Sequence, residues 1–503
     1  MSDFGGVYVL IEDRMKQTME KMAKMSESEY SHFMRLAFGH TTPLQPDTVP
    51  IEFIDPTLNN SQKDAIRFAL GARDIALIHG PPGTGKTHTL IELILQLVQR
   101  GKRILVCGPS NVSVDNIVER LAPTKVPVVR IGHPARLLPS VLEHSLEVLT
   151  QTSDAGGIVK DIRKEMDEKQ ASIRKTRSGR ERRGIYDELK ILRKEFRERE
   201  ARCVDGLVGE SSVVLATLHG AGGHQLKSQK FDVVVIDEAS QALEAQCWIS
   251  LLNADKVVLA GDHLQLPPTV KSTQNEKTEK KKPDSGVSES EILKGVSLEQ
   301  TLFDRLLALH GSGIKRMLTT QYRMHEKIMS FPSSELYEGK LIASDSVKAR
   351  LLADLPYEVH GTDDTQEPLV FWDTQGGDFP EKAEDEIKGG ALLGDSKSNE
   401  MEALVVARHV DNLVDAGLRP ESIAVITPYN GQLALLSRML REKYPGLELG
   451  SVDGFQGREK EAVVVSLVRS NEEHEVGFLA EKRRLNGMFF FVTVQMRESI
   501  ANF

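Results

Sequence analysis

The feature that most constrains this chain is the segment GPPGTGKT at residues 80–87, which lies between two stretches of different periodicity. The residues before it, 75–79, form a short apolar run typical of a buried strand, and the residues around 90–98 have the spacing of an amphipathic helix. Glycines at such a junction let backbone N–H groups surround phosphate oxygens, and the helix N-terminus adds its dipole. The sequence therefore predicts a loop that binds the phosphates of ATP or a related purine nucleotide. Its residues are Gly80, Pro81, Pro82, Gly83, Thr84, Gly85, Lys86 and Thr87.

A second apolar run, residues 231–236, is followed directly by Asp237 and Glu238. A parallel strand delivers such residues to the carboxyl edge of its sheet, where open α/β folds bind ligands. Asp237 and the hydroxyl of Thr87 are then expected to hold Mg²⁺, Lys86 to reach the β- and γ-phosphates, and Glu238 to orient and deprotonate the attacking water. Taken alone, two acids after a strand are more typical of a helix N-terminus, and it is the phosphate-binding loop that favours the catalytic interpretation.

Three further segments carry polar residues next to strand ends or turns. GDHLQLPP presents Gln265, whose amide can sense a γ-phosphate, and QYRMH contains Tyr322, which can stack on a purine, and Arg323, which can act as an arginine finger. SVDGFQGRE ends a strand in a glycine-rich turn that includes Glu459. Singly, each segment is also compatible with an ordinary loop, helix start or surface turn.

Composition limits the class of protein. The chain has 503 residues, of which 40% are hydrophobic and 27% charged, as is usual for a soluble globular protein of about three structural units. We find no apolar run of 18 residues and no basic N-terminal region, so we expect neither a membrane span nor a signal peptide. The three cysteines have neither zinc nor disulfide spacing, which fits a reducing compartment. The net charge of −9 argues against a protein that coats nucleic acid, although a local basic groove remains compatible with it.

Short apolar runs alternate with helical patterns along most of the chain, which predicts an α/β fold with parallel sheets. The region from Lys160 to Arg202 breaks this alternation, with sixteen Lys and Arg against ten Asp and Glu at helical spacing. We expect a charged helical hairpin there. A solvated surface hairpin is the more ordinary interpretation, and an arm that contacts nucleic acid is the alternative. The expected strands are 75–79, 103–107, 126–131, 213–216, 231–236 and 256–260, then 369–372, 423–426, 447–452 and 462–468.

The order of these segments resembles that of superfamily 1 helicases. Along the chain lie SQ at 61–62, GPPGTGKT, GPSNVSVDNIVERL, DEASQALEA, GDHLQLPP, QYRMHEKIM, ITPYNGQ and SVDGFQGREKE. Their spelling is similar to the up-frameshift-like branch. GHPARLL, QALEAQCWI and VGFLAEKRRLN look like its immunoglobulin mu-binding protein 2 group. The resemblance extends from about Leu36 to Asn486. Superfamily 2 helicases lack GDxxQLPP, and GTPases would need an Asn-Lys-x-Asp motif that is absent here.

The resemblance implies two RecA-like P-loop domains with ATP and Mg²⁺ in the cleft between them. It implies that Gln62 reads the adenine edge, that Tyr322 stacks on the base and that Glu459 contacts the ribose side. Gln265 and Arg323 would meet the γ-phosphate. A single strand of DNA or RNA would cross both domains. The residues implied to contact it are Pro109, Ser110, Asn111, Thr217, Thr427, Pro428, Tyr429 and Ser451.

On this basis we expect four regions. Residues 1–55 would form stalk-like helices and a linker, and 56–270 the first RecA-like domain, with a helical insertion at about 135–210. Residues 271–295 would form a flexible linker, and 296–503 the second domain, truncated at its C-terminus.

Two departures from the resemblance lead to further expectations. Only some fifty residues precede the Gln motif, so we expect stalk helices without the β-barrel insert. After KRRLN the family continues as VAxTRA, with a second arginine finger, whereas Phe491 stands at the place of that arginine. We therefore expect the last strand and helix of the second domain to be missing, leaving an open sheet edge.

The resemblance implies an ATP-dependent helicase or translocase that moves 5′ to 3′ as its cleft closes on ATP and opens on hydrolysis. The altered tail favours a second function, an ATP-gated strand-binding module with weak or no turnover. A metabolic P-loop kinase leaves QYRMH and FQGRE without a role. The expected partners are single-stranded DNA or RNA, no membrane, and ribonucleoprotein or ribosome-associated proteins. We expect the chain in cytoplasm and nucleus.

Overall fold

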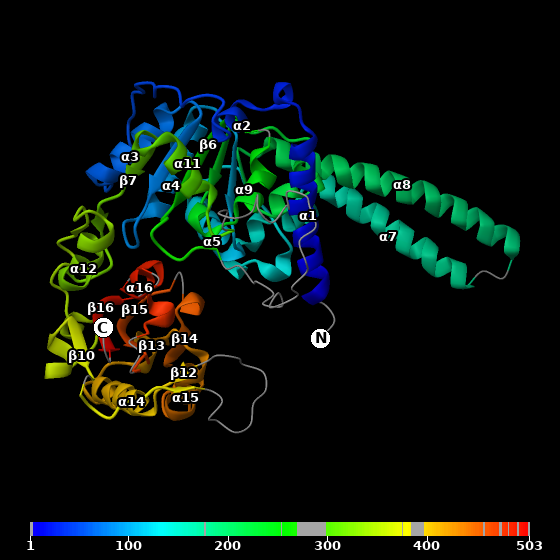
Figure 1. Ribbon diagram of the computed structural model, residues 1–503. Helices are drawn as coiled ribbons and strands as arrows, with labels where there is room; N and C mark the ends of the chain where they lie inside the picture. The colour runs from blue at the N-terminus through cyan, green and yellow to red at the C-terminus, as the bar shows by residue number, and fades with distance from the viewer. Residues whose placement is uncertain are drawn as a thin grey trace, which may run out of the picture. The chain divides into compact units, whose positions relative to one another are not determined.

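A computed structural model describes residues 4–175, 178–252, 254–268, 298–374, 376–383, 397–455, 458–471, 475–480, 482–489 and 492–500. The chain divides into two units (Figure 1). The first comprises Met1–His79, Thr87–Gly261 and Pro268–Arg316, and the second Gly80–Lys86, Asp262–Pro267 and Met317–Phe503. No helix among the described residues is long and apolar enough to cross a membrane.

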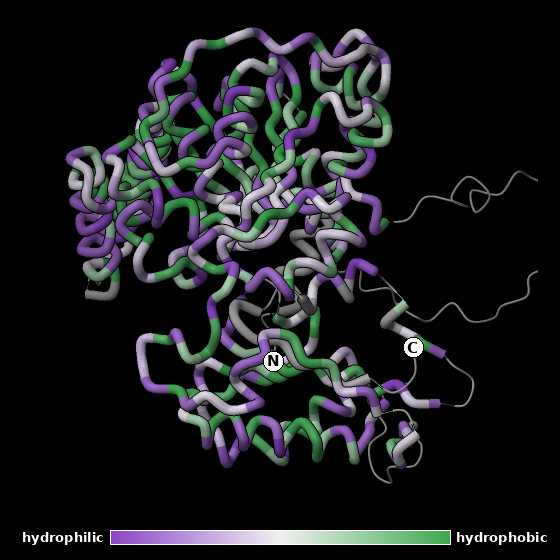
Figure 2. The backbone as a smooth tube through the Cα atoms, turned by 90° about the vertical axis from the view of Figure 1, so that its left-hand side faces the viewer, coloured by the Kyte–Doolittle hydropathy of each residue, from purple (hydrophilic) through white to green (hydrophobic). Residues whose placement is uncertain are grey.

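The first unit is built on a seven-stranded sheet in the order β3-β4-β2-β5-β6-β1-β7. Strands β1 to β6 pair in parallel and are almost entirely buried, as expected for a sheet covered on both faces. Figure 2 shows hydrophobic segments of the backbone in the interior, with hydrophilic segments mostly outside them. Their bounds are β1 Ile75–His79, β2 Ile104–Gly108, β3 Val128–Ile131, β4 Val213–Thr217, β5 Val233–Ile236, β6 Lys256–Gly261 and β7 Lys315–Met317. The six strands expected in this half of the chain are confirmed.

Helices of the first unit cover this sheet and form its N-terminal extension (Figure 1). The region 1–55, where stalk-like helices and a linker were expected, contains α1 and α2. The second packs on the core, where the rings of Phe33 and Trp248 lie 5.8 Å apart. The bounds are α1 Phe4–Lys24, α2 His32–Ala37, α3 Asn60–Gly71, α4 Lys86–Gln99, α5 Asn111–Leu121, α6 Leu146–Thr152, α9 Glu244–Leu251 and α11 Leu302–His310.

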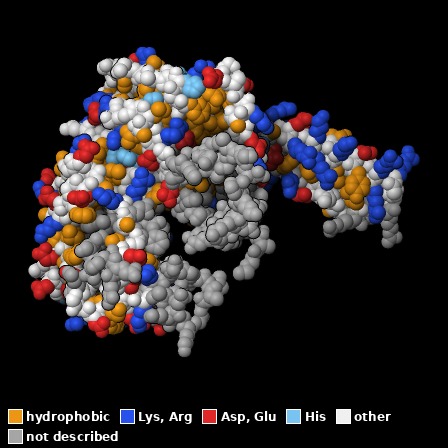
Figure 3. Space-filling view, in the orientation of Figure 1, with side chains coloured by type: hydrophobic (Ala, Val, Ile, Leu, Met, Phe, Trp, Pro, Cys, Tyr) orange, Lys and Arg blue, Asp and Glu red, His pale blue; other side chains and the backbone are white. Residues whose placement is uncertain are grey.

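The charged insertion is a helical hairpin, as predicted. Helices α7 Asp154–Lys175 and α8 Gly179–Glu210 lie side by side and extend away from the sheet (Figure 1). Figure 3 shows Lys and Arg side chains along its surface. Within its stem, charges of opposite sign pair, as between Lys169 and Glu188 at 2.5 Å and along α8 between Glu195 and Arg199 at 2.9 Å. This pairing supports the ordinary interpretation of a solvated hairpin for the stem.

The second unit contains a five-stranded sheet in the order β10-β16-β15-β13-β14, with every pair parallel. Apolar clusters lie on its two faces, one built around Phe455 and the other around Leu436. The strands are β8 Thr320–Gln321, β9 Ile342–Ala343, β10 Leu369–Asp373, β11 Lys382–Ala383, β12 Lys397–Ser398, β13 Ile423–Thr427, β14 Glu448–Ser451, β15 Lys460–Ser466 and β16 Val492–Ile500. The helices are α12 Glu326–Leu336, α13 Asp363–Gln366, α14 Glu400–Asp415, α15 Asn430–Leu440 and α16 Lys482–Phe489. The α/β class with two RecA-like parallel-sheet domains is thus confirmed.

The expectation of a missing last strand is wrong. Strand β16 lies inside the sheet, where Met496 is in register with Val463 of β15 on one side and Leu369 of β10 on the other. The tail can fill this place because Val492, Thr493 and Val494 at the start of β16 have high strand propensity. The open edge expected at this place is therefore not formed. Phe491 and the side chains of β16 lie outside the described residues.

The boundary between the units differs from the one drawn from sequence. The first unit continues to Arg316, because β7 joins the first sheet beside β1 and α11 belongs to the same core. From the sequence, we expected the second domain to begin at residue 296. The expected flexible linker, 271–295, lies outside the described residues.

Candidate functional site

The predicted phosphate-binding loop joins β1 to α4, with Lys86 as the first residue of the helix. Gly83 and Gly85 adopt φ angles of 73° and 76°, a left-handed conformation that side chains disfavour. At Gly80 an added Cβ would lie 2.9 Å from the Cβ of Lys86, so the loop closes tightly on the helix start. The Thr84 hydroxyl donates to the carbonyl of Pro81 at 2.5 Å. The loop therefore has the tight glycine-rich path that phosphate binding requires.

Asp237 and Glu238 follow β5 directly and reach the carboxyl edge of the same sheet. Asp237 is 3% exposed, and its Oδ1 accepts the backbone N–H of Glu238 at 2.9 Å. Glu238 has a φ of 52°, which is uncommon for a residue with a side chain and is typical of functional sites. Its Oε2 accepts the side-chain amide of Gln241 at 2.9 Å. Carboxylate and hydroxyl oxygens are ligands that Mg²⁺ prefers, so Asp237 and Thr87 form a chemically suitable donor set.

Gln265 is held by a buried network that sequence reasoning missed. Its amide NH₂ donates to Oδ2 of Asp262 at 2.8 Å, and the hydroxyl of Tyr337 donates to the same oxygen at 2.7 Å. Asn486 then donates to the Tyr337 hydroxyl at 3.0 Å and to the carbonyl of Leu264 at 2.8 Å. Burial and the negative Asp262 hold the pKa of Tyr337 well above its ordinary value, so the hydroxyl stays a donor. The Gln265 amide is therefore fixed by its NH₂ group, and its carbonyl oxygen lies on the other side.

Arg323 and Glu459, which lie far apart in sequence, are brought together within the second unit. The Arg323 Nε and a Glu459 carboxylate oxygen lie 2.6 Å apart. The neighbouring Tyr322 is 43% exposed, and its backbone N–H donates to the carbonyl of Gly83 at 2.8 Å. An exposed aromatic ring and a paired arginine beside the phosphate-binding loop fit base stacking and phosphate contact.

Gln62 lies in the first turn of α3. Asn59 caps this helix, and its Oδ1 accepts the Gln62 N–H at 3.0 Å. The Gln62 Oε1 in turn accepts the Asn59 N–H at 3.0 Å. Because this reciprocal capping uses the amide oxygen, the NH₂ end is the one that can read an acceptor on a base.

The expected strand contacts of the first unit gather at the carboxyl edge of its sheet. Thr217 ends β4 opposite Gly108, the last residue of β2. Pro109 and Ser110 follow Gly108 directly, and Ser110 caps α5, which begins at Asn111. Beside them, Val112 is 58% exposed.

The expected strand contacts of the second unit also meet at one edge, since Thr427 of β13 is in register with Ser451 of β14. Two of them are inaccessible: Thr427 is fully buried and Tyr429 is 4% exposed. Ser451 and Pro428 are partly exposed. In this structure, therefore, the accessible side chains are those of Pro428 and Ser451, and Thr427 and Tyr429 lie beneath them in the packed interior.

Comparison with known proteins identifies the family to which the chain belongs. Two family models, each described as an AAA domain, match residues 57–273 and 298–489. The DNA polymerase alpha-associated DNA helicase A of Saccharomyces cerevisiae is 43% identical over 507 residues, covering 95% of this chain and 70% of that protein. The protein of the same name from Schizosaccharomyces pombe is 50% identical over 436 residues, covering 87% of this chain and 62% of that protein. The chain belongs to the superfamily 1 helicases of the up-frameshift-like branch.

The mouse DNA-binding protein SMUBP-2 is 45% identical over 478 residues, covering 94% of this chain and 46% of that protein. The chain thus spans about half to two thirds of the length of these relatives. Its likeness to SMUBP-2 agrees with the immunoglobulin mu-binding protein 2 group that the sequence indicated.

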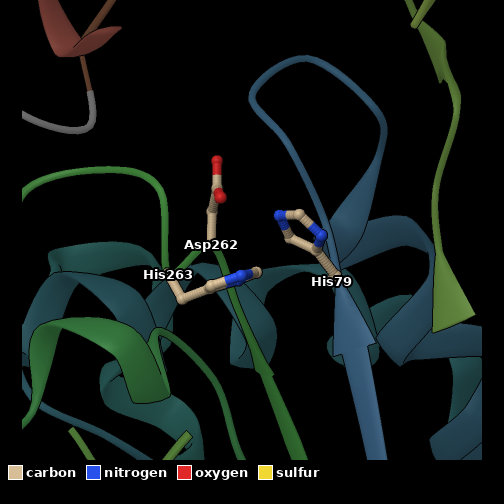
Figure 4. Close-up of side chains that lie close together, drawn as sticks. All are labelled: His79, Asp262 and His263. Atoms are coloured by element: carbon tan, nitrogen blue, oxygen red, sulfur yellow. The ribbon is translucent and has the colours of Figure 1, made fainter. Parts of the chain in front are cut away.

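Three side chains of types that can bind a metal lie close together where β1 and β6 end. His79 is the last residue of β1, in register with Gly261 of β6, and Asp262 and His263 follow that strand (Figure 4). Imidazole and carboxylate groups can bind metals. Asp262, however, already accepts hydrogen bonds from Tyr337, Gln265 and the backbone N–H of Leu264 at 3.1 Å. We therefore assign Asp262 to the network that holds Gln265.

Proposed function

We propose that this chain is an ATP-dependent nucleic-acid helicase or translocase that moves 5′ to 3′ along single-stranded DNA or RNA. The observation that carries this proposal is the loop 80–87 together with Asp237 and the left-handed Glu238 at the same sheet edge. Family membership supports the same activity.

Each predicted residue has a role that its chemistry allows. Lys86 would contact the β- and γ-phosphates, while Thr87 and Asp237 would hold Mg²⁺, which neutralises charge on the phosphate oxygens when bound. Glu238 would accept the proton of the attacking water. Near the γ-phosphate, Gln265 would offer its carbonyl oxygen and Arg323 would offer its guanidinium group.

The nucleotide base and ribose have matching groups. The exposed ring of Tyr322 can stack on adenine, and the NH₂ group of Gln62 can donate to an adenine nitrogen. Glu459 can accept from a ribose hydroxyl. Binding of ATP phosphates would compete with Glu459 for Arg323, because both are anions that a guanidinium can bind.

The proposed strand contacts at the carboxyl edge of each sheet include short polar side chains, such as those of Ser110, Asn111 and Ser451. Such groups suit phosphate and sugar contacts, which carry little sequence information. We therefore propose binding that depends little on sequence, with ribonucleoprotein or ribosome-associated partners and residence in cytoplasm and nucleus. Gradient sedimentation tests the proposed partners, and cell fractionation tests the proposed location.

The experiment is ATP hydrolysis with and without a single-stranded DNA or RNA oligonucleotide, compared with Glu238→Gln. We expect strand-stimulated turnover in the unaltered chain and a loss of about 100-fold or more in the variant, with ATP binding retained. Glu210→Gln, an exposed glutamate at the end of α8, is the matched control.

Unwinding of duplexes with a 5′ or a 3′ tail tests polarity. ATP binding and strand binding without turnover would instead support the ATP-gated binding module, and hydrolysis indifferent to any strand would contradict both functions.

A further inference from the structure

Arg130 of β3 is a fully buried arginine in a strand of valines and isoleucine. Its exposed fraction is 0%. Arginine is almost never fully buried unless it is paired, because removing its charge from water costs several kcal/mol. A side chain kept in such a place needs specific partners.

Arg130 has three such partners, and each of them uses a different nitrogen. Its Nε donates to Oδ1 of Asp115 at 2.7 Å, and Asp115 is also 0% exposed. One terminal NH₂ group donates to the carbonyl of Ile131 at 2.5 Å, and the other donates to Oδ1 of Asn111 at 3.0 Å. The second Asp115 oxygen accepts the backbone N–H of Leu138 at 3.0 Å. The charge of Arg130 is therefore neutralised in the interior, and Asn111 is the side-chain partner that is partly exposed.

The contact with Arg130 sets the orientation of the Asn111 amide. A guanidinium donates hydrogen bonds and accepts none, so the amide atom facing it must be the carbonyl oxygen. The NH₂ group of Asn111 then lies on the opposite side of the amide. Asn111 is partly exposed, between the exposed residues Ser110 and Val112, at the sheet edge that includes Thr217. At this edge Asn111 presents donors only.

We propose that Arg130 is a positioning residue for strand binding, which holds the Asn111 amide so that its NH₂ group donates to a phosphate oxygen of the bound strand. This inference rests on the proposed function, because the ligand is a single strand. Phosphate oxygens are acceptors only, so a flipped amide would turn its oxygen toward them. Arg130 itself does not reach the strand.

Asn111→Asp gives a test in which binding should change much more than stability. The new carboxylate keeps an oxygen toward Arg130 in the first turn of α5, where a negative charge is favourable, while Asp115 one turn further along repels it, so the melting temperature should change little. The same substitution removes both donors and adds a negative charge. We expect binding of fluorescein-labelled dT20 to weaken about tenfold or more at low salt, and less at high salt.

Asn116→Asp is the matched control, because Asn116 is exposed on the same helix and the charge added is the same. It should change dT20 binding by less than about twofold. Asn111→Ala should have an intermediate effect of about three- to fivefold. Arg130→Lys combined with Asn111→Ala should bind no more weakly than Asn111→Ala alone, since the two residues act as one unit.

The outcomes separate this inference from the proposed function. Failure of the unaltered chain to bind dT20 would overturn both. Normal binding by the unaltered chain, together with Asn111→Asp behaving like Asn116→Asp, would overturn the positioning role alone. If Arg130→Lys does not fold, the comparison of the two aspartate variants still decides.

Discussion

Replacing Glu402 by glutamine should change how the stability of the second unit depends on pH. Glu402 lies in the first turn of α14 and is 1% exposed. Its carboxylate accepts the Ser466 hydroxyl at 2.7 Å and the backbone N–H of Val468 at 3.0 Å. Val468 has a φ of 73°, a strained value for a β-branched residue, and this N–H contact helps to hold it.

Burial raises the pKa of Glu402 from 4.5 to about 7, although the hydrogen bonds from Ser466 and Val468 lower it in part. At about 1.4 kcal/mol for each pKa unit, the ionised form is about 3 kcal/mol less favourable in the folded protein than in the unfolded chain. Because the folded state keeps its proton to higher pH, this group contributes stability that is fully present below pH 4.5 and is lost as the pH rises to about 7.

The assay is urea unfolding at several pH values from 4.5 to 8, followed by tryptophan fluorescence. Trp248 reports on the first unit and Trp372 on the second, and Trp372→Phe identifies the transition that belongs to the second unit. Glutamine does not titrate, so the stability of Glu402→Gln relative to the unaltered chain should rise by about 3 kcal/mol across this range.

Glu400→Gln is the control for this assay, since Glu400 is exposed in the same turn and the substitution is the same. Glu381 titrates in a lower range: burial by itself raises its pKa, but hydrogen bonds from Lys397, the Ser470 N–H and Arg469 lower it overall. A stability difference for Glu402→Gln that stays constant within about 1 kcal/mol would refute the reasoning.

Two other substitutions follow from the site. Gly83→Ala should weaken ATP binding at least about tenfold, measured with a fluorescent ATP analogue, because φ is 73° and the added Cβ would lie 2.7 Å from the Cβ of Arg323. Unchanged affinity would contradict the tight path of the loop. Tyr337→Phe should cost about 1–3 kcal/mol of unfolding free energy in urea, because Asp262 loses a buried donor and Asn486 an acceptor. A neutral result would show that the network is not needed to hold Gln265.

The sheets and the residues at their carboxyl edges could be read from sequence because their signals are local. A buried parallel strand is an apolar run, and residues such as Asp237 that follow it must lie at the carboxyl edge of the sheet. The charged hairpin was likewise visible as helical spacing of like and unlike charges. The N-cap of α3 could not be read in this way, because Asn59, Asn60 and Ser61 are all good caps and only the reciprocal contact with Gln62 selects one.

The tail shows where resemblance misled. Its residues differ from those of the family, and from this difference we expected a strand to be lost. The residues nevertheless have strand propensity, and β16 pairs between β10 and β15. Backbone groups make the ladder hydrogen bonds of a parallel sheet, so a segment can pair there without matching the residues of the family at each position. Agreement with the family at each position was therefore a poor guide to whether the tail pairs as a strand.

By itself the sequence determined the phosphate-binding loop, the acids after β5, the α/β class and the family, since each depends on residues close together in the chain. Only the tertiary structure decided which polar side chains meet in the interior: Arg130 with Asp115 and Asn111, Tyr337 with Asp262 and Asn486, and Glu402 with Ser466 and Val468. These residues are from 15 to 149 positions apart in the pairs that join them. The physical reason is that a buried polar group must find a partner, while neither its spacing nor its neighbours in sequence say which one it will find.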